Sequence, residues 1–146
     1  MKNNIHYEHD CGFILNEELF ATLIEIKSKS INVTIPDSIH RNHKTYTVIK
    51  IDTSPKIKKE LFYSDIYIHQ LANIKFLTVP STVKYISSRS FEFCQLLQTV
   101  SFVSTETHPS LLEEIGDYAF AKCSNLKKVN IPSSVKRIGK YAFESC

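Results

Sequence analysis

Glycine and the short motifs of enzyme active sites are scarce in this sequence. The chain has 146 residues and only 3 glycines, so a glycine-rich loop that cradles phosphate groups is not supported. It contains neither the G-x-S-x-G turn of serine hydrolases nor the H-E-x-x-H pair of zinc peptidases. We therefore predict a protein that is not an enzyme, with no catalytic residues and no cofactor.

Long apolar runs are also lacking. The opening stretch, MKNNIHYEHDCGFILNEELF, has no apolar segment of the length that a signal peptide or a membrane helix requires. We expect no membrane span and no signal peptide, which favours an intracellular location. Hydrophobic residues make up 42% of the chain and charged residues 23%, a balance typical of a folded soluble domain. The net charge of +3 is a weak indication of an acidic partner.

Metal-binding spacing is not evident. The cysteines form no C-x-x-C pair and stand at Cys11, Cys94, Cys123 and Cys146. Histidines with i, i+3 spacing could hold a metal ion on a helix, but both such pairs lie in polar segments without a helical pattern: His6 with His9, and His40 with His43. We expect no metal site. The carboxylates of Glu113, Glu114 and Asp117 are interpreted as an exposed corner rather than as an acid and base pair.

An internal repeat is present instead. The last 21 residues place apolar or small residues at Leu126, Val129, Ile131, Val135, Ile138, Gly139, Ala142, Phe143 and Cys146. The segment 74–94 has the same order at the same offsets: Ile74, Leu77, Val79, Val83, Ile86, Ser87, Ser90, Phe91 and Cys94. A third copy opens with Leu97, Val100 and Phe102 and closes with Leu112, Ile115, Gly116, Ala119, Phe120 and Cys123. Three copies indicate a solenoid of stacked coils.

The middle copy is longer than the last. Phe91 and Phe120 are 29 residues apart, whereas Phe120 and Phe143 are 23 apart. The extra residues fall at VSTETHPS, which is polar and contains Pro109. This composition predicts a loop inserted between two coils.

The N-terminal third has a different pattern. GFILNEELFATLIEI predicts two short strands around a polar bend, and INVTIPDSI repeats the strand and proline corner of the later copies. KTYTVIKI is a further β-rich run. We interpret this part as a hairpin-like cap that covers the first coil. A degenerate copy follows, with Tyr63, Ile68, Leu71 and Asn73 at the Ile, Phe, Cys and Asn offsets.

These residues resemble the BspA-like leucine-rich repeats of the Treponema pallidum type, with the pattern LxxIxIPxxVxxIGxxAFxxC, and the match is close at 126–146. The fold predicted is a right-handed, β-rich leucine-rich-repeat solenoid with a parallel sheet of short strands and an irregular or short-helical opposite face. We expect a single domain, 1–146, comprising the N-terminal cap and first repeat (1–50), a degenerate repeat (51–73) and repeats at 74–96, 97–125 and 126–146.

The repeat also predicts the core. Leu126, Val129 and Ile131 should point inward, and Gly116 and Gly139 should permit a tight bend. The phenylalanines Phe91, Phe120 and Phe143 should stack as a buried ladder, with Cys94, Cys123 and Cys146 as small apolar fillers beside it. Neighbouring coils about 5 Å apart are within disulfide reach, so oxidation of these cysteines stays open.

The resemblance implies a surface or secreted recognition protein, often an adhesin, that binds a protein ligand on its repeat sheet. The residues predicted to form the contact surface are Lys75, Phe76, Thr78, Gln98, Thr99, Ser101, Lys127, Lys128 and Asn130. The alternative is that they are only solvated strand positions. Phe76 fits that alternative least well.

Other roles stay open at this stage. An intracellular scaffold with the same fold is the runner-up. A weak nucleic-acid binder is suggested by Lys127, Lys128, Lys136, Arg137 and Lys140, but nearby carboxylates dilute that signal. Self-association is a further possibility, because Cys146 completes a repeat and no polar cap follows it in this sequence.

Overall fold

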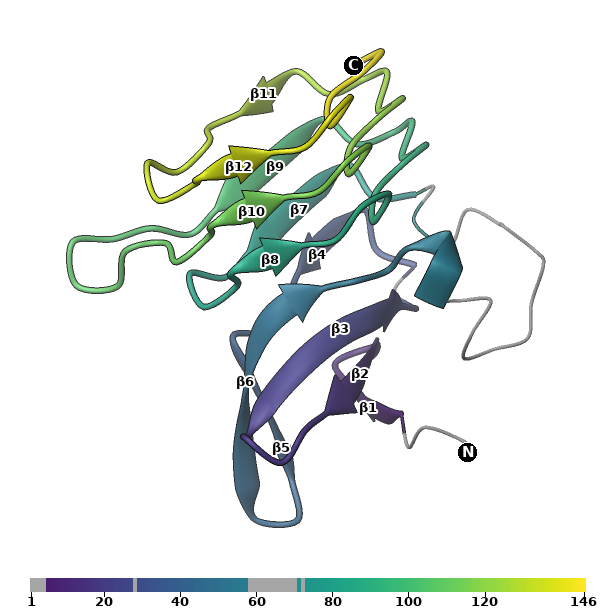
Figure 1. The fold of residues 1–146 in the computed structure, drawn as a ribbon. Helices are drawn as coiled ribbons and strands as arrows, with labels where there is room; N and C mark the ends of the chain where they lie inside the picture. The colour runs from purple at the N-terminus through teal and green to yellow at the C-terminus, as the bar shows by residue number, and fades with distance from the viewer. Residues whose placement is uncertain (1–4, 28, 58–70, 72) are drawn as a thin grey trace.

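The regular secondary structure of the described residues consists almost entirely of short strands joined by turns and loops (Figure 1). The computed structural model describes residues 5–27, 29–57, 71 and 73–146. The strands are β1 (His6–Glu8), β2 (Cys11–Leu15), β3 (Phe20–Ile26), β4 (Asn32–Thr34), β5 (Ser38–Arg41), β6 (Lys44–Ile51), β7 (Phe76–Val79), β8 (Tyr85–Ile86), β9 (Thr99–Phe102), β10 (Glu114–Ile115), β11 (Lys128–Val129) and β12 (Arg137–Ile138).

Two sheets enclose the core. One is four-stranded, with the order β11-β9-β7-β4, and its neighbouring strands are parallel. The other is eight-stranded and follows the path β1-β2-β3-β6-β8-β10-β12, with β5 paired to β6. From β7 onward the chain alternates between the two sheets, so each coil adds one strand to each and the coils lie one above another (Figure 1). The predicted leucine-rich-repeat solenoid is confirmed.

The predicted repeats correspond to these coils. The segments 74–96, 97–125 and 126–146 each contain one strand of the four-stranded sheet and one of the eight-stranded sheet. Their boundaries, and the single-domain assignment, stay predictions. The degenerate copy inferred from Tyr63 and Ile68 lies outside the described residues, apart from Leu71, which is buried, and Asn73, which is exposed.

The N-terminal cap is an extension of both sheets. β2 and β3 form the antiparallel hairpin that the sequence predicts, and β1 pairs with β2. β6, the KTYTVIKI segment, pairs in parallel with β3 and with β8, and so joins the cap to the coils. β4, from the INVTIP segment, pairs with β7 in the four-stranded sheet. Both edges of the first coil are therefore covered.

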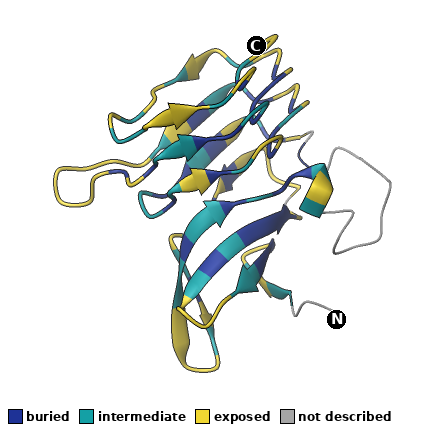
Figure 2. Ribbon diagram, in the orientation of Figure 1, coloured by how far each residue is buried: buried dark blue, intermediate teal, exposed yellow. Residues whose placement is uncertain are grey.

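Inward-pointing aliphatic residues stack in register from coil to coil. Val33, Leu77, Val100 and Val129 pair across the four-stranded sheet, and Ile51, Ile86, Ile115 and Ile138 do so across the other. Figure 2 shows the buried band between the sheets. The band ends at the last coil, where Leu126 and Val129 are only half-buried and Ile131 is 38% exposed, because no further coil covers them.

The second face of each coil differs from the prediction of an irregular or short-helical segment. The residues around Ile86, Ile115 and Ile138 form two-residue strands that pair in parallel. The coils are short enough that this segment lies directly above its counterpart, and the backbone groups of adjacent coils therefore hydrogen-bond to one another.

The role predicted for Gly116 and Gly139 is wrong. Neither glycine has a positive φ, so neither is needed for a tight bend. A Cβ atom on Gly116 would lie 2.5 Å from the backbone nitrogen of Ser88, and one on Gly139 would collide with Asp117. Glycine is required because successive coils approach too closely for a side chain. The residues that do adopt positive φ are non-glycine, among them Arg89, Tyr118 and Tyr141 at equivalent offsets.

The polar insertion of the middle copy is confirmed as a loop. Residues 103–109 are exposed and project from one side of the stack (Figures 1 and 2). Local hydrogen bonds shape the loop: the backbone nitrogen of His108 donates to Thr105 Oγ1 at 2.9 Å, and that of Ser110 donates to Ser104 Oγ at 3.1 Å.

The phenylalanine ladder is also confirmed. The ring centroids of Phe91 and Phe120 are 5.2 Å apart and those of Phe120 and Phe143 are 5.4 Å apart, with nearly parallel planes. The cysteines predicted to pack beside the ladder are thiols in the described structure. Cys94 and Cys123 are buried, whereas Cys146 is exposed. Cys123 Sγ donates to the carbonyl of Phe91 at 3.3 Å, and Cys146 Sγ donates to that of Phe120 at 3.2 Å.

Candidate interaction surface

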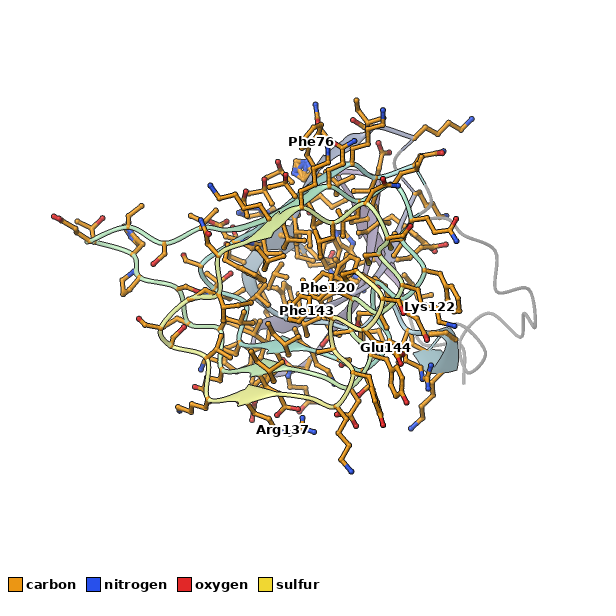
Figure 3. The ribbon with its side chains drawn as sticks, turned by 90° about the horizontal axis from the view of Figure 1, so that it is seen from above. Phe76, Phe120, Lys122, Arg137, Phe143 and Glu144 are labelled. Carbon is orange, nitrogen blue, oxygen red and sulfur yellow. The ribbon has the colours of Figure 1, made fainter. Side chains whose placement is uncertain are left out.

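The outward side chains of the four-stranded sheet form one surface across four strands. In β7, Leu77 and Val79 are each 1% exposed, whereas Phe76 is 42% exposed. Side chains alternate along a strand, so Phe76 and Thr78 point outward. Figure 3 shows Phe76 on the outside of this sheet and Arg137 on the opposite side of the molecule, with Phe120 and Phe143 between them.

Strand register arranges the outward residues in rows. In the first row Asn32 lies opposite Phe76, Phe76 opposite Thr99, and Thr99 opposite Lys128. The second row contains Thr34, Thr78 and Ser101. Each row runs across the coils rather than along one strand.

The residue before each strand extends the surface. The backbone nitrogen of Gln98 donates to the carbonyl of Lys75 at 2.8 Å, and that of Lys127 donates to the carbonyl of Gln98 at 2.9 Å. Asn130, exposed, follows β11. The structure thus brings the predicted residues together. We call this surface the Phe76 face, and its members are Asn32, Thr34, Lys75, Phe76, Thr78, Gln98, Thr99, Ser101, Lys127, Lys128 and Asn130.

Asn32 and Thr34 are additions that sequence reasoning missed. They are exposed on β4, which belongs to the cap and not to the recognised repeats. The signal was present, because Ile35 and Pro36 stand in the same relation as Val79 and Pro80 in the later copy. The cap therefore contributes to the candidate surface as well as covering the first coil.

The opposite face has paired charges. Lys136 Nζ lies 3.2 Å from Glu113, and Arg137 forms ion pairs with Glu114 and with Asp117, the latter at 3.1 Å. These three carboxylates, interpreted from the sequence as an exposed corner, are half-buried and paired with basic side chains of the next coil. Asp117 Oδ1 also accepts a hydrogen bond from the backbone nitrogen of Lys140 at 2.8 Å, which ties adjacent coils together.

The basic residues proposed for nucleic-acid binding are divided between the two faces. Lys127 and Lys128 lie on the Phe76 face, whereas Lys136 and Arg137 lie on the other sheet, paired with carboxylates. Tyr141 stacks on Tyr118 with centroids 5.0 Å apart. The structure does not assemble one basic patch from the five residues.

Three histidines surround one carboxylate in the cap. His6 Nε2 and His9 Nε2 each lie 3.3 Å from Glu8, His40 Nδ1 lies 3.9 Å away, and the His40 backbone nitrogen donates to Glu8 at 2.9 Å. Burial acts to raise the pKa of Glu8, but these hydrogen bonds and imidazole charges outweigh it and lower that pKa. His43 is not part of the group. Within the described residues no set of three or more His, Cys, Asp or Glu side chains is arranged to hold a metal ion.

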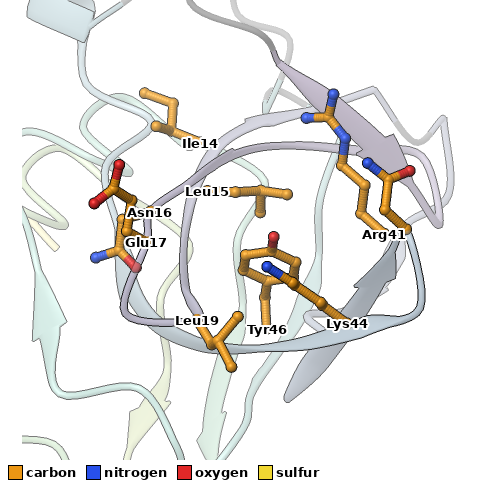
Figure 4. Close-up of a pocket in the computed structure, with 9 residues that line it drawn as sticks. Ile14, Leu15, Asn16, Glu17, Leu19, Arg41, Lys44 and Tyr46 are labelled. Atoms are coloured by element: carbon orange, nitrogen blue, oxygen red, sulfur yellow. The ribbon is translucent and has the colours of Figure 1, made fainter.

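A shallow pocket of about 460 Å³ lies between the β2–β3 turn and the β5–β6 hairpin (Figure 4). Leu15, Leu19 and Tyr46 supply its apolar surface, and Arg41 and Lys44 supply positive charge. It is distant in sequence from every predicted site residue, and no motif indicated it. No helix in the described part of the chain is long and apolar enough to span a membrane.

The repeated sequence pattern matches a known family. The family model for the BspA type leucine rich repeat region matches residues 65–146, with six copies. The chain belongs to the BspA-type leucine-rich repeat family. No curated protein matches it.

Solved structures of leucine-rich repeat proteins share the fold of this BspA-type chain. A leucine rich cell surface protein from Faecalibacterium prausnitzii is 27% identical, with a TM-score of 0.75 over 97% of this chain and 34% of its own. A leucine-rich repeat protein from Bacteroides capillosus is 26% identical, with a TM-score of 0.70 over 92% and 86%. The pneumococcal vaccine antigen PcpA is 23% identical, with a TM-score of 0.68 over 98% and 36%, and shows the fold alone. The BspA-type chain thus spans about a third of the length of the first of these proteins.

Proposed function

We propose that this chain is a non-catalytic protein-interaction module of a surface or secreted recognition protein, and that the Phe76 face is its contact surface. One observation carries the proposal: an aromatic side chain, 42% exposed, stands on a sheet face whose other members are short polar residues and lysines. An exposed aromatic ring among polar neighbours is typical of an interaction hot spot.

The comparisons support the location. One similar structure, 27% identical, is described as a cell surface protein. The parallel strands also support the mode of binding, because β4, β7 and β9 each contribute one residue to each row of the Phe76 face, and the rows offer an extended surface to a partner.

A pair of matched variants tests the contact surface. Phe76→Ser removes the exposed ring of β7, and Tyr85→Ser removes a similarly exposed ring (38%) from β8 on the opposite sheet. Both side chains are on the surface, so the free energy of unfolding of each variant should lie within about 0.5 kcal/mol of that of the parent protein.

The variants are used as bait against purified extracellular matrix proteins and against a cytosolic lysate. We expect a matrix protein to be captured by the parent and by Tyr85→Ser, and to be lost with Phe76→Ser. Partners from the cytosol alone would favour an intracellular scaffold. Partners retained by Phe76→Ser, or lost equally with both variants, would contradict the choice of surface.

A further inference from the structure

The Phe76 face has charge of one sign. The four segments that form its strands and the residues leading into them are 29–34, 74–79, 97–102 and 126–131. They contain the lysines Lys29, Lys75, Lys127 and Lys128 and no aspartate or glutamate. The charged side chains of these segments are therefore all positive, and the segment 97–102 has no charged residue.

These lysines are not neutralised by neighbours. Among the described residues, Lys75, Lys127 and Lys128 form no ion pair, whereas Lys136 and Arg137 on the other sheet are paired with Glu113, Glu114 and Asp117. The difference follows from register. On the eight-stranded sheet an acidic coil lies between basic ones, while on the four-stranded sheet threonine and glutamine occupy the position between the lysines.

Hydrogen-bond donors accompany the charge. The hydroxyl groups of Thr78, Thr99 and Ser101 make no side-chain hydrogen bond within the described structure. Thr99 lies between Phe76 and Lys128 in the first row, and Thr78 and Ser101 lie in the second row. Hydroxyl and ammonium groups both donate to carboxylate oxygens. Phe76 and Lys128 are two strands apart, about 10 Å, a distance that a few residues of extended chain cover.

We infer that the partner of the Phe76 face is a protein segment rich in aspartate or glutamate, with an apolar side chain that packs on Phe76 and carboxylates that contact Lys75, Lys127 and Lys128. The inference rests on the proposed function and specifies the chemistry of the partner. A nucleic acid fits this face less well, because the face offers a single aromatic ring where stacked bases need successive rings, and it has no arginine.

Synthetic peptides test the inference. The probe is a short peptide of glutamates around a central phenylalanine, labelled for fluorescence anisotropy. One control peptide has glutamine in place of every glutamate, another has serine in place of phenylalanine, and a single-stranded oligonucleotide of equal charge is the competing polyanion.

Matched double variants separate the face from net charge. Lys127→Gln with Lys128→Gln removes two charges from the Phe76 face, and Lys84→Gln with Lys136→Gln removes two from the opposite sheet. We expect the first pair to weaken binding of the acidic peptide about tenfold and the second less than twofold. Raising the salt from about 0.05 M to about 0.5 M should also weaken it severalfold, because these charges are exposed.

Several results would overturn the inference: equal binding of the glutamine peptide, equal losses in the two double variants, tighter binding of the oligonucleotide, or no saturable binding of the acidic peptide. A captured protein whose binding depends on Phe76 but not on Lys127, Lys128 or salt would overturn only the acidic partner and leave the proposed function intact. Failure of the proposed function is seen instead when Phe76→Ser captures the same partners as the parent protein.

Discussion

Phe120 lies between two rings, and its own ring is 5.4 Å from that of Phe143 with only 3° between their planes. Phe91 stacks on its other side at 5.2 Å. Each ring belongs to a different coil, so this column joins neighbouring repeats through apolar contact and couples their stability. In a solenoid such contacts between neighbours largely determine whether a coil is folded.

Phe120→Ala should therefore destabilise the fold by about 3 to 5 kcal/mol, because it removes a fully buried ring and leaves a cavity between two coils. Phe143→Ala should reduce the free energy of unfolding clearly less, because Phe143 is only half-buried. Urea unfolding followed by far-ultraviolet circular dichroism measures both, since the chain has no tryptophan. Equal losses would contradict the ladder as a link between coils.

Gly116→Ala should destabilise the protein by about 1 to 3 kcal/mol, although alanine usually favours folding over glycine. The reason is steric: the added methyl group would press on the backbone of Ser88 in the coil below. Ser87 holds the same offset one coil earlier, and Ser87→Ala serves as the control with little expected change. Thermal unfolding of the two variants tests this prediction. A melting temperature of Gly116→Ala equal to that of the parent protein would contradict the close contact between coils.

Lys122 has a φ of 60°, where residues with a Cβ atom are strained. Lys122→Gly should be more stable than Lys122→Ala by about 1 kcal/mol, and both variants lose the same contact with the Phe93 ring. At Lys136, which is not among the positive-φ residues, the order should reverse. Chemical denaturation of the four proteins gives the comparison. If the alanine variant were more stable than the glycine variant at both positions, the left-handed backbone conformation at Lys122 would be contradicted.

The four cysteines should differ in reactivity. Cys146 is exposed, so a thiol reagent should label it first in the native protein, and mass spectrometry can locate the label. Burial raises the pKa of Cys146, so labelling at neutral pH should be slower than for a free thiol, because less thiolate is present. Cys11, whose pKa burial raises to about 11, should react only on unfolding. Labelling of Cys11 at the rate of Cys146 would contradict the packed cap.

Glu8 should make the cap sensitive to acid. Its pKa is lowered in the folded protein, so its contribution to stability is present above the unfolded value and is lost as the pH falls through the folded value. Glu8→Gln should remove this dependence and leave a shallower loss of stability below about pH 4.5. Unfolding measured from neutral to acidic pH tests it, with Glu17→Gln on the exposed β2–β3 turn as the control. Parallel curves for Glu8→Gln and the parent protein would exclude the role.

The architecture could be predicted from the sequence, because the spacing of Phe91, Phe120 and Phe143 and of the aliphatic residues before each proline repeats coil by coil. A periodic apolar pattern can be buried only by stacking, so the solenoid, the phenylalanine ladder and the inserted loop follow from the pattern alone. Alternation along each strand also identified Phe76 and its neighbours as outward-facing.

The contacts that these positions make between coils could not be predicted from the sequence and depend on the three-dimensional fold. The glycines are needed where two coils touch, and that contact joins residues 22 or more positions apart. Register determined that the charges of one sheet pair while the lysines of the other do not, and that β4 of the cap completes the Phe76 face. Ion pairing and steric exclusion depend on which side chains lie within a few ångströms across coils, and a pattern along the chain does not specify those distances.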